Sequence, residues 1–137
     1  MSLSVGGLPW FGIALATLAY YLLGAVWFTP LFGRAWDAAL GHTRESNSRF
    51  APRYYVVPLI SCLVVTTATA MLAYALDLDR ISDALVLGSI VGLGYAASVT
   101  LTNAVTPTTP RPWLFAIVTG GYHLVGCLIV ATIVVAL

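Results

Sequence analysis

Long apolar runs alternate with short polar segments along this chain. The six arginines and five acidic residues all lie within residues 34–53, within residues 77–83, or at position 111. The stretches between them are four apolar runs, at residues 8–28, 54–76, 84–105 and 113–137. A helix needs about 20 apolar residues to cross a hydrocarbon core of about 30 Å. The pattern therefore predicts four transmembrane helices.

The apolar runs lack the strict alternation of polar and apolar residues that membrane-spanning strands require. The predicted fold class is all-α: an integral membrane four-transmembrane-helix bundle, with residues 1–137 as a single membrane domain. A short interfacial helix is expected after the first span. From Leu31 to Leu40 the apolar positions recur at helical spacing, and Gly41 is suited to a helix C-terminus.

Composition agrees with a lipid environment. Hydrophobic residues make up 60% of the chain and charged residues 8%, against roughly 45–50% and about 25% in soluble domains. This composition excludes a soluble globular domain. The sequence also contains no glycine-rich phosphate loop and no basic stripe, so neither a nucleotide site nor a nucleic-acid partner is expected.

The arginines predict the orientation in the membrane. Four of them lie between the first two apolar runs, and Arg111 lies between the last two, whereas Arg80 is surrounded by three aspartates. Positive residues favour the cytoplasmic side. We therefore expect a multi-pass protein of the cell membrane, with the first and third loops cytoplasmic and both termini extracytoplasmic.

Two sequence segments resemble a known family. The first is Gly24-Ala-Val-Trp-Phe-Thr-Pro-Leu-Phe-Gly-Arg-Ala-Trp36, and the second is Gly121-Tyr122-His123 in the last apolar run. Together they resemble the small four-helix membrane proteins grouped as domain of unknown function 1761. The resemblance implies the four-helix fold and brings no established reaction, substrate or cofactor.

His123 is the most conspicuous polar residue inside a predicted span. It follows Trp113 by ten residues, which places it roughly 15 Å along the helix and near the bilayer midplane. Tyr95 has about the same predicted depth. The candidate acid or base groups are His123, Tyr95, Tyr122 and Asn103. The candidate binding residues are Tyr20, Tyr21, Trp27, Tyr95 and His123.

Two interpretations of His123 remain open at this stage. In one, it forms a buried site for a small amphiphilic molecule, as a proton donor or acceptor or as a metal ligand. In the other, it hydrogen-bonds Tyr95 or a backbone carbonyl and only orders the packing. Cys62 and Cys127 are the only other metal-ligating side chains in the predicted spans, too few for a zinc site. No metal and no cofactor are therefore expected.

The remaining expectations concern surfaces. The four tryptophans lie near predicted span ends, where the indole is a common interfacial anchor. Gly88, Gly92 and Gly94 form a strip of small residues in the third span, followed by Gly120, Gly121 and Gly126 in the fourth. Such strips permit close helix packing, either within the bundle or between subunits. A homodimer or higher homo-oligomer is the expectation from this pattern.

Three functions remain in consideration. The first is a non-catalytic bundle, or one that binds a lipid or a small hydrophobic molecule. The second is a small membrane-embedded enzyme that acts on a hydrophobic substrate with His123 as acid or base. The third is a dimeric transporter or channel, which the absence of charged residues within the spans disfavours.

Overall fold

The computed structural model describes residues 3–44 and 50–137 and contains four helical spans. These spans are Trp10–Leu31, Arg53–Ala75, Ile81–Ala104 and Pro112–Ala136, and each is long and apolar enough to cross a membrane. Within the described residues the chain has helices and no strand. The all-α fold and the four predicted spans are confirmed, and the helices are those of a multi-pass membrane protein.

Two of the spans contain π-helical turns. The first consists of α1 (Trp10–Val26) and the π-helix η1 (Trp27–Leu31). The third consists of α4 (Ile81–Ser89), the π-helix η2 (Ile90–Ala97) and α5 (Ser98–Ala104). The second and fourth spans are the uninterrupted helices α3 (Arg53–Ala75) and α6 (Pro112–Ala136). Pro58 lies inside α3 without ending it.

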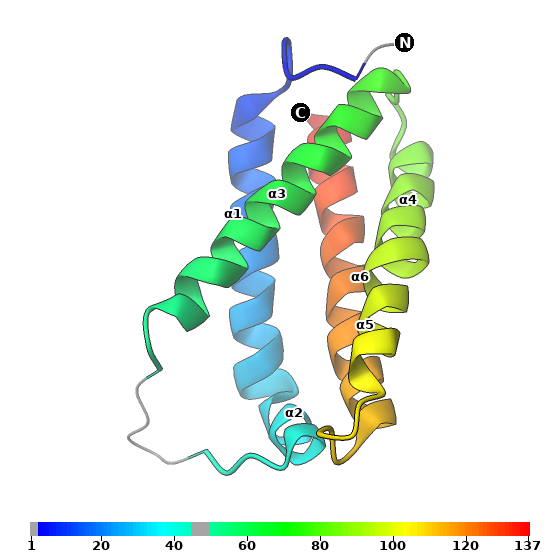
Figure 1. Ribbon diagram of the computed structural model, residues 1–137. Coiled ribbons are helices and arrows are strands. Elements are labelled where there is room, and N and C mark those ends of the chain that lie inside the picture. The colour runs from blue at the N-terminus through cyan, green and yellow to red at the C-terminus, as the bar shows by residue number, and fades with distance from the viewer. Residues whose placement is uncertain (1–2, 45–49) are drawn as a thin grey trace.

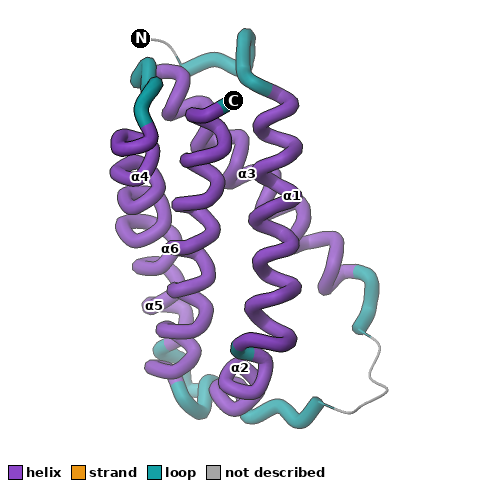
Figure 2. The backbone as a smooth tube through the Cα atoms, turned by 180° about the vertical axis from the view of Figure 1, so that it is seen from behind, coloured by secondary structure: helices purple, strands orange, loops and turns teal. Residues whose placement is uncertain are grey.

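Helix α6 is the centre of the bundle. It lies between α1 on one side and the third span on the other, and α3 crosses the same face of both α1 and α6 (Figures 1 and 2). Because neighbours surround it, α6 is buried on more than one side. Its buried residues are Val118, Gly120, Tyr122, Gly126, Cys127, Val130, Ala131 and Val134.

The third span approaches α6 closely through glycines. A Cβ atom at Gly88 would lie 2.8 Å from the Cα of Leu128, and one at Gly92 would lie 3.0 Å from the Cα of Leu124. Small residues allow such close backbone packing. This part of the predicted small-residue strip therefore serves a contact inside the bundle. A Cβ atom at Gly94 would have no neighbour within 4 Å, and the homo-oligomer stays a prediction.

Helix α3 joins the bundle from Cys62 onward. Residues 53–61 are all exposed, and the first buried residue of the helix is Cys62. Figure 1 shows the beginning of α3 diverging from the other spans. The exposed side chains here include Val56, Val57 and Ile60, which are apolar and suited to contact with lipid.

The predicted short helix after the first span is confirmed. Helix α2 (Gly33–Leu40) ends at Gly41, which has the left-handed backbone conformation with φ 66°. The N–H of Arg111 donates a hydrogen bond of 3.1 Å to the carbonyl of Ala39, so α2 is attached to the loop before α6. Both chain ends lie at one end of the bundle, and α2 lies at the other (Figure 1).

Candidate functional site

The fold brings together the two sequence segments that carry the family resemblance. A Cβ at Gly24 would lie 3.0 Å from the hydroxyl oxygen of Tyr122, and one at Gly121 would lie 3.3 Å from the ring of Trp27. Each segment thus contributes a glycine against which an aromatic ring of the other packs. The first span, its π-turn and α6 interlock at this point.

Tyr122 is the centre of an aromatic cluster, which consists of Tyr20, Trp27, Phe28, Phe32, Trp36, Tyr122 and His123. The centroid of the Tyr122 ring lies 5.1 Å from those of Tyr20 and Phe28 and 4.9 Å from that of His123. Pairs of aromatic rings stabilise a fold at these separations. The cluster therefore links α1, η1 and α2 to α6.

The polar core of the cluster is a pair formed by His123 and Tyr20. The hydroxyl oxygen of Tyr20 lies 2.6 Å from Nδ1 of His123. Tyr20 is only 2% exposed, so its hydroxyl needs a partner inside the protein. The bond orients the imidazole, because the hydrogen bond at one ring nitrogen determines the role of the other.

Tyr122 supports this pair from a second direction. Its hydroxyl donates a hydrogen bond of 3.3 Å to the backbone carbonyl of Tyr20 and lies 3.7 Å from Sγ of Cys62 on α3. Tyr122 thus connects three spans and is a positioning residue for Tyr20. Cys62 and Cys127 are free and buried.

Two of the four tryptophans make contacts inside the protein. Nε1–H of Trp27 donates a hydrogen bond of 2.8 Å to the carbonyl of Val118, and Trp36 packs against Phe28 with ring centroids 5.5 Å apart. Trp27 and Trp36 are half-buried, so each indole also packs within the protein. Trp10 and Trp113 are exposed, as anchors should be.

Tyr95, one of the two partners considered for His123, does not pair with it, since Tyr20 takes that place. Tyr95 lies in η2 and is 68% exposed. A π-helix has more residues per turn than an α-helix. Gly92 packs on α6, and Tyr95 follows it by three residues. In a π-helix three residues cover a smaller part of a full turn, so Tyr95 does not return to the side that faces α6.

The other candidates are dispersed. Asn103 is exposed near the end of α5. Tyr21 packs against the core but makes no side-chain hydrogen bond to a described residue. Thr119, one helical turn before His123, was not predicted, and its buried hydroxyl has no partner among the described residues. Thr119 precedes His123 by four residues on the same predicted helix, so both lie on one face. This spacing could have identified Thr119 as a neighbour of His123 from the sequence. No group of three metal-ligating side chains occurs in the described part of the chain.

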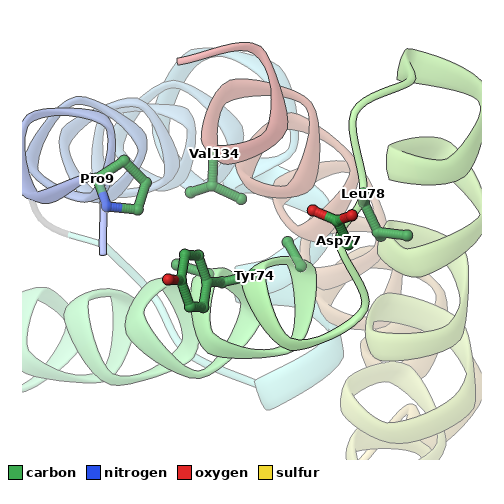
Figure 3. Close-up of a pocket in the computed structure, with 7 residues that line it drawn as sticks. Pro9, Tyr74, Asp77, Leu78 and Val134 are labelled. Atoms are coloured by element: carbon green, nitrogen blue, oxygen red, sulfur yellow. The ribbon is translucent and has the colours of Figure 1, made fainter. Parts of the chain in front are cut away.

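The side of α6 that carries His123 reaches α3 near the chain ends, at Val134. His123, Cys127, Val130 and Val134 recur at helical spacing and form one stripe. Val134 lines a small pocket of about 110 Å³ together with Ala70 and Ala73 of α3 (Figure 3). At the other end of the stripe α3 has diverged, and His123 is only half-buried. Its Nε2 atom makes no hydrogen bond to the residues that the structure describes.

Two pockets lie away from His123. The first is the pocket of Figure 3, near the chain ends, where Pro9, Tyr74, Asp77 and Leu78 complete the lining. The second is an open cavity of about 630 Å³ formed by η1, α2 and the segment after it. The two differ in chemistry, because the second contains arginines and the first does not.

Comparison with known proteins identifies the family alone. No curated protein and no solved structure matches the chain. The family described as "Protein of unknown function (DUF1761)" matches over residues 11–135. This range includes both glycine-containing segments and all of the aromatic cluster. The chain belongs to the DUF1761 family.

Proposed function

We propose that this protein binds an amphiphilic small molecule, a lipid or another hydrophobic compound, from within the membrane and without catalysing a reaction on it. The observation that carries this proposal is the half-buried His123, held at Nδ1 by Tyr20 at 2.6 Å on the side where α3 diverges. The polar group of the ligand would bind Nε2, and its apolar part would lie along the exposed first half of α3.

Physical chemistry favours a ligand at this nitrogen. A polar atom exposed to hydrocarbon raises the free energy of the protein unless it finds a hydrogen-bond partner. Tyr20 occupies Nδ1, so Nε2 is the atom left to recognise a hydroxyl, carbonyl or similar group. The Tyr20 bond orders the imidazole before a ligand arrives, which lowers the entropic cost of binding.

The enzyme alternative has weaker support. Of the four candidate acid or base groups, Tyr95 and Asn103 are exposed elsewhere, and the Tyr122 hydroxyl already donates to the carbonyl of Tyr20. His123 is left without a second acid or base beside its free nitrogen. The transporter alternative is disfavoured because the spans carry charged residues only near their ends, at Arg53 and Asp83.

Native mass spectrometry tests the proposal directly. The full chain is released from mild detergent, and the fraction that retains a bound molecule is compared between wild type and His123→Ala. We expect this fraction to fall about tenfold in the variant. A tenfold change corresponds to about 1.4 kcal/mol, which is the contribution of one hydrogen bond. Tyr95→Phe is the matched control, because it also removes a polar group from a span, but from an exposed position in η2. This variant should retain the ligand.

Thermal unfolding of both variants accompanies this measurement. Equal retention in wild type and His123→Ala, with both folded, would contradict the proposal. So would a wild-type protein that carries no small molecule when released directly from its membrane. In that case His123 would be a packing residue.

We also propose the orientation. The end of the bundle that carries α2 and the loop before α6 faces the cytoplasm, and both termini face the other side. The support is the charge pattern: residues 34–53 and Arg111 contain five arginines and two acids, whereas residues 77–83 contain one arginine and three acids. Positive loops stay cytoplasmic.

A further inference from the structure

The open cavity beside α2 has a chemistry that the His123 site lacks. It lies at the end of the bundle opposite the termini, where the first span ends and α2 begins. Its volume is about 630 Å³, and the polar residues that line it are Thr29, Arg34, Asp37, His42, Thr43 and Arg44. Cations, hydroxyls and one carboxylate thus surround a single space.

Arg44 is a fixed part of this cavity. Its Nη2 atom forms an ion pair of 3.0 Å with Asp37, and both of its Nη atoms lie 3.4 Å from the carbonyl oxygen of Phe28. Gly33 packs against the same carbonyl, since a Cβ there would lie only 2.9 Å from the oxygen of Phe28. The guanidinium is therefore held against the junction of η1 and α2, and Asp37 balances its charge.

Arg34 supplies a positive charge to the cavity, and Asp37 is paired with Arg44 instead. It lies on α2 three residues before Asp37, and it is exposed. It makes neither an ion pair nor a side-chain hydrogen bond with any residue in the described ranges. Among the described residues that line the cavity, Asp37 is paired to Arg44, and Arg34 adds a positive charge outside that pair. Thr29 and Thr43 supply hydroxyl donors.

We infer that this cavity binds a phosphate group, either the headgroup of an anionic lipid or a soluble phosphate. Arginine recognises phosphate oxygens through paired N–H donors, and hydroxyl donors complete such sites. The position supports the inference, because α2 directly follows a transmembrane span and the cavity therefore lies at the level where lipid headgroups meet water. Basic pockets at this depth attract anionic headgroups. The site is separate from His123 and does not depend on the function proposed above.

Binding to the full chain in detergent tests this inference. The probes are dioctanoyl phosphatidic acid, dioctanoylglycerol, which has the same chains without the phosphate, and inorganic phosphate. We expect wild type to bind phosphatidic acid at least about tenfold more tightly than the diacylglycerol. Arg34→Gln should weaken phosphatidic acid binding about fivefold, as expected for a partly exposed charge pair, and leave diacylglycerol binding unchanged.

Arg53→Gln is the matched control. It removes the same charge from the exposed beginning of α3, where it does not line the cavity, and it should leave binding unchanged. Arg34→Lys should keep most of the affinity. Because Arg34 has no partner among the described residues, its replacement should not unfold α2, and circular dichroism checks this.

The outcomes are distinct. If inorganic phosphate binds and displaces phosphatidic acid, the site is a phosphate site with a soluble ligand; if only phosphatidic acid binds, the source is lipid. Equal weakening by Arg34→Gln and Arg53→Gln would overturn the inference, because the effect would then be general attraction to positive charge. Equal affinity for phosphatidic acid and diacylglycerol would overturn it as well.

Discussion

The absence of a side chain at Gly126 leaves the space in which the ring of Tyr20 packs. A Cβ at Gly126 would overlap the ring of Tyr20, which is buried and hydrogen-bonded to His123. The ring cannot move aside without losing that bond or its contact with Tyr122. Glycine is therefore required at this position by space and not by backbone conformation.

Gly126→Ala should consequently destabilise the protein by about 1–3 kcal/mol, the usual cost of overpacking a core. The variant should also bind less ligand at His123, because Tyr20 is displaced. Thermal unfolding in detergent measures the first effect.

Gly94→Ala is the control for this substitution, since no atom lies within 4 Å of the added methyl group. It should leave the stability within about 0.5 kcal/mol of wild type. Equal melting temperatures for Gly126→Ala and Gly94→Ala would show that close contact with the Tyr20 ring does not lower the stability of the protein.

At the scale of the elements, the sequence was sufficient to predict the four spans and the short helix after the first, because charge and apolar length report membrane crossing directly. The sequence was not sufficient to predict the direction in which each residue faces around the axis of its helix. Tyr95 was expected at the depth of His123, but it lies in the π-helical turns of η2 and is exposed. The apolar pattern of this span is equally compatible with α-helical turns, so the sequence carries no signal for that change.

The close contact between α4 and α6 yields a prediction for Gly88. An added methyl group would lie 2.8 Å from the Cα of Leu128 and 2.9 Å from the carbonyl oxygen of Cys127, and these backbone atoms have little freedom to shift. Gly88→Ala should separate the third span from α6 and lower the unfolding free energy by about 1–3 kcal/mol. Unfolding in mixed detergent micelles measures this.

Gly120→Ala tests whether the effect comes from this contact. Gly120 faces the same span, but its nearest neighbour, the Cβ of Ala97, would lie at the ordinary distance of 3.5 Å. It should be tolerated. A loss of stability at Gly120 as large as that at Gly88 would mean that any methyl group added between the third span and α6 disturbs the bundle, whatever its distance from the neighbouring backbone.

At the scale of the whole molecule, the apolar pattern does not indicate which span is central. It also leaves the two glycine-containing segments as separate features, without showing that they meet. Tyr20 and His123 were both candidates at similar depth, yet their pairing depends on how α1 and α6 are rotated toward each other. Such rotations result from the packing of all four spans, so they become visible only in the assembled structure.

The proposed orientation predicts an asymmetry in chemical labelling. The cysteine of Asp79→Cys, between α3 and α4, should react with a membrane-impermeant thiol reagent added outside the cell. The cysteine of Thr108→Cys, between α5 and α6, should react only after the membrane is permeabilised. Both positions are exposed, whereas Cys62 and Cys127 are buried and should contribute little background. The opposite pattern would reverse the orientation.

The central helix α6 is also the last span in the chain, so the other three are synthesised before their common partner. Tyr20, Trp27 and Cys62 all belong to spans that are synthesised before α6, and each has a polar partner on α6. While α6 is still inside the ribosome, these groups enter the membrane without those partners. A defect in α6 therefore removes a packing partner from each of the three earlier spans.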